Sequence, residues 1–308
     1  MLDLHGLHIR AALLRLLREF FFERGFLEVD TPVRQPVIIP EQYIEPITAE
    51  GQFLQTSPEL CMKRILAAGA DTIFQICPCF RKGERGRRHL EEFTMLEWYR
   101  RGEDYRSLMA DCEDLLRFVV LGLPAFEAEK KFETRRLAHI DFSKFLEPAE
   151  HITVEEAFNR FSPVPMARAL EQDLFDEIVV EHIEPKLGIG KPTFLTDYPV
   201  QLASLAKVSA DNPQVAERFE LYIDGIELAN GFTELTDADE QRTRFLAEQA
   251  AIKNDQGRQQ EIPERFLNDL NQLADAAGIA FGLDRLLMLL TGSDTIQSVV
   301  TFAPDDMI

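Results

Sequence analysis

Two glutamates, Glu220 and Glu227, flank a short turn in a position to hold a metal ion together. Residues 219–230 alternate apolar residues with others around Asp224-Gly225, a pair typical of a two-residue β-hairpin turn. In such a hairpin the two carboxylates share one face as diagonal neighbours, roughly 7–8 Å apart at Cα. That arrangement suits Mg²⁺, which proteins usually bind through one or two carboxylates and the phosphates of a substrate.

The predicted hairpin also specifies which residues pair across its two strands. It pairs Ile223 with Ile226, Tyr222 with Glu227, and Glu220 with Ala229, and it directs these side chains toward the core: Phe219, Leu221, Ile223, Ile226 and Leu228. We expect a bulge at Gly231, before Glu234. Taken alone, an ordinary half-exposed hairpin with solvated glutamates is the better explanation, because antiparallel sheets commonly carry polar residues on one face.

A second block of chemistry-bearing residues follows an apolar strand that ends near Arg81. A guanidinium on a rigid strand suits bidentate contact with phosphate and keeps its charge at every physiological pH. Phe93 offers a flat face on which an adenine could stack. The loop arginines Arg85, Arg87 and Arg88 fit a solvated basic loop equally well, whereas Arg81 follows Cys79-Phe80 and fits that explanation less well.

A third block, residues 278–290, places Arg285 in an otherwise apolar helix. A buried guanidinium without an anionic partner costs several kcal/mol, so Arg285 needs one. The partner is either an internal carboxylate, such as Asp284, or a nucleotide phosphate near the start of the helix, where glycines let backbone approach a ligand. The residues leave both possibilities open.

Composition narrows the class of protein. The chain has 308 residues, 45% of them hydrophobic, and 33 Lys and Arg against 53 Asp and Glu give a net charge of −20. This balance argues against tRNA or an anionic membrane as a partner. The four cysteines lack zinc-ligand spacing and fit buried thiols in a reducing cytoplasm. Neither a signal peptide nor a membrane-spanning run is present, so we expect a cytoplasmic globular protein.

The elements that must position these residues follow from apolar spacing and turn signals. Helices are expected over 8–24, 57–68, 104–121, 237–255 and 281–290, and strands over 26–29, 53–55, 72–79 and 92–99. Residues 123–190 are weakly patterned and are expected to form an insertion with helices near 153–160 and 174–182. Because strands and helices mix without a βαβ rhythm, the pattern predicts an α+β fold with an antiparallel sheet flanked by helices.

Together these blocks resemble the motifs of class II aminoacyl-tRNA synthetases, and most closely those of the lysyl-tRNA synthetases. Residues 26–32 resemble the first class motif, whose proline lies at a dimer interface, residues 80–99 the second, and residues 282–285 the third. The lysyl blocks TSPE and IELANGF-x-EL appear at 56–59 and 226–235. The resemblance implies a class II catalytic core that forms a homodimer.

Lysyl-tRNA synthetases carry an anticodon-binding domain before this core, whereas here the first expected helix begins almost at Met1. A single catalytic domain over 1–308 without an anticodon-binding domain, and with LEWY at 96–99, resembles the EpmA/GenX/PoxA family of lysyl-tRNA synthetase paralogues. That family attaches β-lysine to a lysine of translation elongation factor P. Ala280 stands where the synthetases have glycine, and the resemblance implies that its methyl favours an amino group moved from α to β.

The resemblance implies a two-step ligation that uses ATP and Mg²⁺ and takes lysine or β-lysine as its substrate. Arg81, Glu220, Glu227 and Arg285 would be the catalytic residues, with Mg²⁺ on Glu220 and Glu227. The implied ATP site consists of Arg81, Lys82, Glu84, His89, Phe93, Glu220, Leu221, Gly282 and Arg285. The implied amino-acid site consists of Ser57, Glu59, Glu97, Tyr99, Glu227, Asn230, Glu234 and Ala280.

One departure from the family pattern concerns the adenine contact. The second motif normally reads Phe-Arg-x-Glu, but Gly83 occupies the glutamate position and Glu84 comes one residue later. Either Glu84 substitutes through a shifted loop or the contact is lost. Leu90-Glu91 also replaces the family's Asn-Pro.

Three other functions stay open. The first is acylation of tRNA through its acceptor stem alone, which the missing anticodon-binding domain opposes. The second is a non-catalytic synthetase paralogue, which Gly83 and Leu90 motivate. The third is amidation through an adenylate, as in asparagine synthetase, which the acidic cluster of Glu59, Glu97 and Glu234 opposes.

Overall fold

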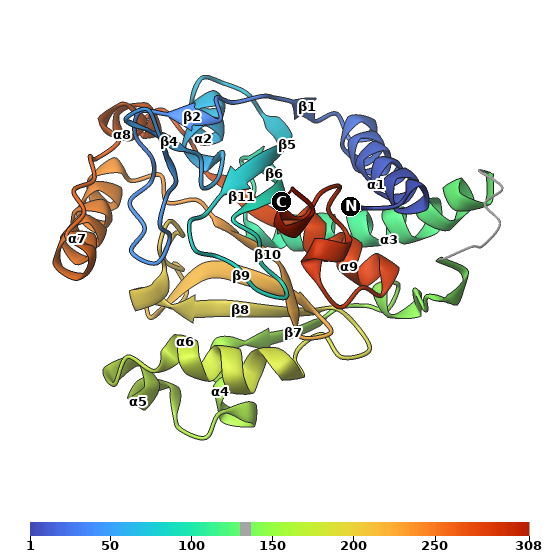
Figure 1. Ribbon diagram of the computed structural model, residues 1–308. Helices are drawn as coiled ribbons and strands as arrows, with labels where there is room; N and C mark the ends of the chain where they lie inside the picture. The colour runs from blue at the N-terminus through green and yellow to red at the C-terminus, as the bar shows by residue number, and fades with distance from the viewer. Residues whose placement is uncertain (130–136, 308) are drawn as a thin grey trace.

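The computed structural model describes residues 1–129 and 137–307, and its centre is a mixed eight-stranded sheet (Figure 1). The strand order is β1-β5-β6-β11-β10-β9-β8-β7. All pairs from β5 through β8 are antiparallel, and the edge pairs β1·β5 and β7·β8 are parallel. The strands are β1 (Leu27–Glu28), β5 (Thr72–Phe80), β6 (Glu92–Arg101), β7 (Glu150–Thr153), β8 (Thr193–Pro199), β9 (Val215–Ile223), β10 (Ile226–Thr233) and β11 (Ala276–Gly282). A small second sheet has the order β2-β4-β3, with β2 (Arg34–Gln35), β3 (Thr48–Ala49) and β4 (Gln52–Leu54).

Helices cover the sheet in three groups, each with its own buried cluster (Figure 1). The first contains α1 (Leu4–Glu23), α3 (Tyr105–Glu129) and α9 (Leu283–Thr291), and the second contains α2 (Glu59–Ala67), α7 (Ala238–Gln256) and α8 (Glu264–Leu270). The third contains α4 (Val154–Phe161), α5 (Met166–Glu171) and α6 (Phe175–Ile178), which continues as a π-helical turn, Val179–Ile183. Single 3₁₀ turns lie at Leu137–His139, Ser143–Phe145, Glu184–Lys186, Val200–Leu202, Ile296–Ser298 and Pro304–Met307.

Local sequence explains where the main helices begin and end. Asp3 caps α1 by accepting a hydrogen bond from the Gly6 N–H at 2.9 Å. Thr153 and Glu156 form a reciprocal capping box at the start of α4. At the other end of α7, Gly257 adopts a left-handed conformation with φ of 63°, as helix-terminating glycines commonly do.

The hairpin at Asp224-Gly225 is confirmed, and one part of its predicted register is wrong. Ile223 pairs with Ile226 and Tyr222 with Glu227 as expected, but a bulge at Leu228 places Glu220 opposite Asn230 instead of Ala229. The expected bulge at Gly231 is therefore absent, and Gly231 pairs with Phe219 in regular register. Leu228 and the adjacent Ala229 both pack into the same core cluster, which requires this irregularity.

The largest difference from the expected elements is β11. Residues 276–282 form a central strand between β6 and β10, and the helix predicted over 281–290 begins only at Leu283. This strand is buried on both faces, so its sequence lacks the alternation that marks a half-exposed strand. Gly278 admits the neighbouring side chains, because a Cβ there would lie 2.2 Å from Cε1 of Tyr99 and 2.3 Å from Oε1 of Glu234.

The weakly patterned segment contains more regular structure than expected. Helices predicted near 153–160 and 174–182 correspond to α4 and to α6 with its π-helical turn. β7 was not predicted, nor was β8 just after the segment, and α3 continues to Glu129 beyond its expected end at 121. Residues 130–136, part of the expected insertion, lie outside the described residues. Among the described helices, none combines the length and the apolar character that crossing a bilayer requires.

Candidate active site

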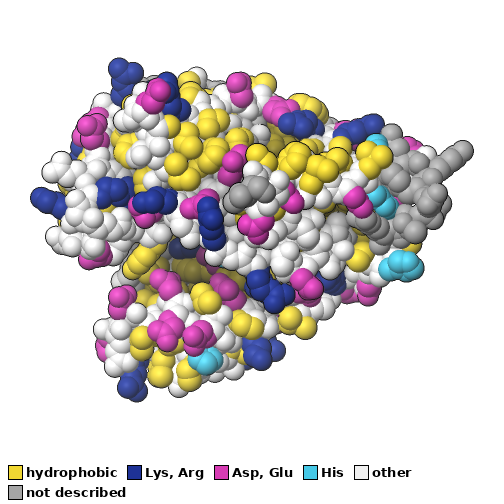
Figure 2. Space-filling model, viewed as in Figure 1, with side chains coloured by type: hydrophobic (Ala, Val, Ile, Leu, Met, Phe, Trp, Pro, Cys, Tyr) yellow, Lys and Arg dark blue, Asp and Glu magenta, His cyan; other side chains and the backbone are white. Residues whose placement is uncertain are grey.

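A cavity of about 580 Å³ opens on the sheet where β6, β11, β10 and β9 lie side by side. Figure 2 shows its mouth as a hollow between the body of the molecule and the lobe that carries α4, α5 and α6. The cavity wall includes most of the residues singled out from the sequence: Ser57, Glu59, Arg81, Glu84, His89, Phe93, Glu97, Tyr99, Glu220, Glu227, Asn230, Ala280, Gly282 and Arg285.

Three of the predicted site residues do not line the cavity. The ammonium of Lys82 pairs with Glu45 on the exposed side of its loop. Leu221 is fully buried in the core, because successive side chains of a strand point to opposite faces and its neighbour Glu220 faces the cavity. Glu234 lies behind the wall, fully buried and ion-paired with Lys63.

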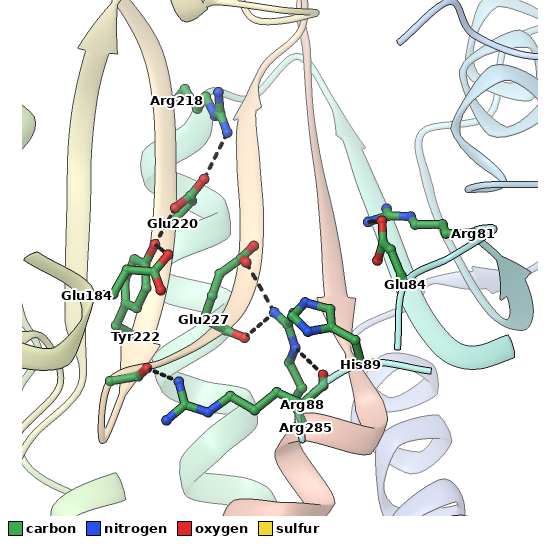
Figure 3. Close-up of polar contacts among 11 residues, drawn as sticks. Arg81, Glu84, Arg88, His89, Glu184, Arg218, Glu220, Tyr222, Glu227 and Arg285 are labelled. Atoms are coloured by element: carbon green, nitrogen blue, oxygen red, sulfur yellow. Dashed lines mark hydrogen bonds and ion pairs between the residues drawn. The ribbon is translucent and has the colours of Figure 1, made fainter. Parts of the chain in front are cut away.

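The hairpin carboxylates occupy one end of the cavity, and each has a cationic partner (Figure 3). Glu220 accepts a hydrogen bond from the Tyr222 hydroxyl at 2.6 Å and one from Arg218 at 2.8 Å. Glu227 pairs with Arg285, whose guanidinium lies 3.1 Å from its carboxylate and donates to its backbone carbonyl at 2.8 Å. The bulge at Leu228 puts Glu227 and Asn230 on the face that carries Glu220.

These contacts settle the partner of Arg285 within the protein. It is the carboxylate of Glu227 and not that of Asp284. Asp284 pairs with Arg10 at 2.6 Å and accepts a hydrogen bond from the Thr94 N–H at 2.7 Å. Asp284 therefore holds α9 against α1 and β6, while Arg285 faces the cavity.

A third carboxylate, Glu184, extends this end of the cavity and was missed by the sequence analysis. It accepts a hydrogen bond from the Tyr222 hydroxyl at 3.3 Å, and burial, then Glu227 and Glu220, raises its pKa to about 7. Burial followed by the charge of Glu227 also raises the pKa of Glu220. Carboxylates that raise each other's pKa are stabilised by an added cation, so Glu220 and Glu227 suit one divalent ion that is also held by the phosphates of a substrate. Within residues 1–129 and 137–307, no three metal-ligating side chains lie together as a preformed metal site.

Arg81 lies across the cavity from the hairpin (Figure 3). Its guanidinium is positioned 5.2 Å from the centre of the Phe93 ring, and its Nε lies 3.5 Å from the carbonyl of Thr56. The carboxylate of Glu84 is 3.9 Å from Arg81. An always-charged fork beside an aromatic face can bind an oxyanion and a planar base together.

The cavity wall at Glu59 and Glu97 is acidic, and a buried cation, Lys63, lies behind it. Its ammonium pairs with Glu59 at 2.5 Å and with Glu234, and only 1% of the Lys63 side chain is exposed. Glu97 accepts a hydrogen bond from the Tyr99 hydroxyl at 3.0 Å, but its second oxygen has no hydrogen-bond partner among the described residues. Burial raises the pKa of Glu97 well above its ordinary value and that of Glu234 to about 8.

Comparison with known proteins gives the family. A family model described as tRNA synthetases class II (D, K and N) matches residues 4–306. The chain belongs to this class II synthetase family. Similar proteins named elongation factor P–(R)-β-lysine ligase include those of Pectobacterium carotovorum subsp. carotovorum strain PC1 and Proteus mirabilis strain HI4320. The first is 39% identical over 96% of this chain and 93% of its own length, and the second 38% over 95% and 93%.

In this member of the class II synthetase family, the loop at the second motif is held closed by contacts that the sequence did not reveal. Gly83 has φ of +77°, and its N–H donates to Glu91 at 2.8 Å, while Glu91 also accepts from Arg85 at 2.6 Å. This turn, which favours glycine, brings Glu84 into the cavity wall beside Arg81. The loop therefore keeps a carboxylate near the motif arginine despite the glycine.

The far end of the same loop contacts the hairpin and α9 (Figure 3). Arg88 donates to the Gly225 carbonyl at 2.7 Å, and the ring of His89 lies 2.7 Å from Arg285. Burial and then Arg285 lower the pKa of His89, which favours the neutral ring. The sequence left a solvated position open for Arg88, and its actual partner could not be predicted because that partner is a backbone carbonyl far along the chain.

The raised pKa of Glu184 makes a prediction about stability. The folded protein keeps this proton up to about pH 7, whereas an ordinary glutamate loses it near pH 4.5. Ionising Glu184 in the folded protein therefore costs stability. This cost is absent below pH 4.5, grows as pH rises and is complete above pH 7. We expect Glu184→Gln to raise the free energy of unfolding by about 1–2 kcal/mol at pH 7.5, allowing for solvent screening.

Urea unfolding at pH 4.5 and pH 7.5 measures this effect, with the exposed Glu181→Gln in the same segment as the control. The Glu184→Gln difference should disappear at pH 4.5, and the control should show no difference at either pH. A stabilisation that is equal at both pH values would contradict the assigned cause.

Proposed function

We propose that this protein is an ATP-dependent ligase that activates (R)-β-lysine, or lysine, as an acyl-adenylate and transfers it to a lysine side chain of elongation factor P. The main support is that one cavity joins an acidic end, containing Glu59 and Glu97, to an end with arginines and paired carboxylates. Such a cavity suits a substrate with two ammonium groups beside a nucleotide–metal complex. The names of the similar proteins agree with this reaction.

In the first step the amino-acid carboxylate attacks the α-phosphorus of ATP, and pyrophosphate leaves. The residues act by position and charge. Arg81 would orient the substrate carboxylate and the α-phosphate, Arg285 the γ-phosphate, and Phe93 the adenine, with His89 nearby. Glu220 and Glu227 would hold Mg²⁺, which neutralises charge on the phosphates when bound.

In the second step the neutral amine of the acceptor lysine attacks the acyl carbon, and the bond from that carbon to the AMP oxygen breaks. The mixed anhydride is already activated, so no nucleophile from the protein is required, and we assign none. Glu59 and Glu97 would face the two ammonium groups of the amino acid, because an ammonium that leaves water needs an anionic partner. The other cavity residues around the amino acid would shape the space beside it; they are Ser57, Tyr99, Asn230 and Ala280.

The deciding experiment supplies ATP and radiolabelled (R)-β-lysine or lysine together with either elongation factor P or total tRNA. We expect label on elongation factor P and none on tRNA. Label on tRNA alone would support the tRNA-acylating alternative and contradict the proposal. The absence of pyrophosphate exchange with either amino acid would support a non-catalytic paralogue.

We also propose that the protein is a cytoplasmic homodimer. The family resemblance of residues 26–32, with Pro32 at the expected interface, supports the dimer. Multi-angle light scattering on the purified protein tests the dimer directly, and a mass near 35.2 kDa would contradict it.

Substitution of Ala280 tests the proposed isomer preference. Ala280 lies between Glu97 and Asn230 in the sheet and lines the cavity, so its methyl occupies space beside the substrate. We expect Ala280→Gly to shift the ratio of kcat/KM for the two isomers about 10-fold toward α-lysine. This is the lower end of the discrimination that a single carbon gives in an enzyme pocket. Pyrophosphate exchange with each isomer measures the ratio.

A matched control is Ala277→Gly in the same strand, because Ala277 is buried in the core and does not line the cavity. It should lower stability and leave the isomer ratio unchanged. If Ala280→Gly also left the ratio unchanged, the methyl would have no part in choosing the isomer.

A further inference from the structure

Glu41 is a cavity residue with no role in the function described so far. It lies between β2 and β3 and is partly exposed. The backbone on both sides is held: the Gln42 N–H donates to Glu248 at 2.8 Å, and the Ile39 carbonyl accepts from Gln260 at 2.9 Å. The backbone at Glu41 is therefore held by the fold on both sides of the residue.

The carboxylate of Glu41 makes no hydrogen bond or ion pair with another residue in the described part of the chain. The other buried or partly exposed carboxylates of the cavity wall all have partners: Glu59, Glu84, Glu97, Glu184, Glu220, Glu227, Glu248 and Asp284. Burial, opposed by Arg81 and increased by Glu59, Glu248 and Glu84, raises the pKa of Glu41 to about 7. Such a group gains from an arriving cation.

The buried cation Lys63 limits which carboxylates can bind the substrate. Lys63 already neutralises part of the charge of Glu59 and Glu234, so these two carboxylates are not free to pair with two further ammonium groups. Glu97 keeps one oxygen without a partner at the bottom of the cavity, where its side chain is 1% exposed. A second free carboxylate is needed for a doubly cationic substrate, and Glu41 supplies it in the cavity that Arg81 and Glu59 also line.

We propose that Glu41 is a specificity-determining residue that receives the substrate amino group nearer to the carboxylate and thereby sets the preference between β-lysine and α-lysine. This inference rests on the proposed function. Arg81 holds the substrate carboxylate in that function, and Glu41 lines the same cavity as Arg81 and Glu59. A carboxylate in the cavity that also holds the carboxylate-binding arginine distinguishes amino groups that differ by one carbon in position.

Pyrophosphate exchange with each isomer tests the assignment in the intact protein with Glu41→Gln and Glu41→Asp. We expect Glu41→Gln to lower kcat/KM for (R)-β-lysine about 10-fold or more, chiefly through KM, with a smaller loss for α-lysine, because a charged hydrogen bond is exchanged for a neutral one. The ratio for the two isomers should change at least about 3-fold. Glu41→Asp keeps the charge and should recover part of the β-lysine activity.

The control is Glu45→Gln, which removes the same charge from the same segment but affects an exposed residue outside the cavity wall. It should leave both isomers unchanged. Equal losses for both isomers, or an altered KM for ATP with an unchanged isomer ratio, would overturn the proposal. So would unchanged exchange combined with slower transfer to elongation factor P, which would instead make Glu41 a base for the acceptor amine.

The same experiment separates this inference from the proposed function. Exchange by the wild-type protein with an unchanged isomer ratio in Glu41→Gln contradicts only the assignment of Glu41. The absence of wild-type exchange with either isomer contradicts the proposed function and the assignment together. Thermal unfolding of each variant confirms that it is folded before its exchange is compared.

Discussion

Replacing Glu227 by glutamine is expected to lower adenylate formation about 10²–10³-fold, the usual loss when one charge-stabilising group leaves an active site. Under the proposed function an amide at this position is a poorer ligand for Mg²⁺ than a carboxylate. The fold should remain intact, because Arg285 also donates to the backbone carbonyl of residue 227, which the substitution keeps. Pyrophosphate exchange measured over a range of Mg²⁺ concentrations is the appropriate assay.

The matched control for Glu227→Gln is Glu150→Gln, which also removes a carboxylate from a strand of the same sheet but lies outside the cavity wall. It should exchange pyrophosphate as the wild-type protein does. Near-normal exchange by Glu227→Gln, at every Mg²⁺ concentration, would remove Glu227 from the proposed metal site. A large fall in its melting temperature would show instead that the Arg285 pair is mainly structural.

Substituting Arg81 by lysine should reduce pyrophosphate exchange about 10²-fold, although the formal charge is kept. Lysine presents a point charge on a flexible stem, whereas arginine presents a planar fork that can contact two oxygen atoms together. The Phe93 ring and the Thr56 carbonyl beside Arg81 fit that planar group. The loss should appear in kcat as well as in KM, since the fork orients the two reacting groups.

Arg85→Lys provides the comparison for Arg81→Lys. Arg85 lies four residues along the same chain segment, is largely exposed and pairs with Glu91 outside the cavity wall. The same change there should alter exchange less than about 2-fold, in line with the small contribution of exposed ion pairs. Similar losses in both variants would mean that the assay reports loop stability and not the chemistry of Arg81.

The sequence predicted those parts of the fold that depend on local signals. Asp224-Gly225 specifies its hairpin because both residues must adopt positive φ, and they do so at 51° and 67°. The bulge at Leu228 was not predictable in the same way. It arises because Leu228 and Ala229 both pack into the core. Their burial depends on how the neighbouring strands β9 and β11 pack on either side.

Strand β11 shows why a period-based prediction fails at the centre of a sheet. Its residues are small or apolar throughout and are buried on both faces, so neither the two-residue nor the 3.6-residue period appears. The motif residues at its end nevertheless placed Arg285 correctly in a helix that faces the cavity. Sequence motifs therefore predicted that the Arg285 side chain lies at the cavity more reliably than they predicted where the helix begins.

The residues that were missed, Lys63, Glu41 and Glu184, share a physical cause. Lys63 lies four residues after the predicted Glu59 on α2, and that spacing predicts contact on a helix. What it cannot predict is burial, which follows from Glu234 approaching from another part of the chain. Glu41 and Glu184 likewise lie in segments without strong patterning, and only the tertiary fold brings them to the cavity.

The ion pair between Arg285 and Glu227 has a consequence for thermodynamic linkage. A cation that drew Glu227 away would leave the guanidinium without its carboxylate, and an anion that drew Arg285 away would leave the carboxylate unpaired. Under the proposed function, each ligand alone must break this pair, whereas metal and triphosphate arriving together compensate both charges. Their binding should therefore be mutually cooperative, with each lowering the dissociation constant of the other by the same factor.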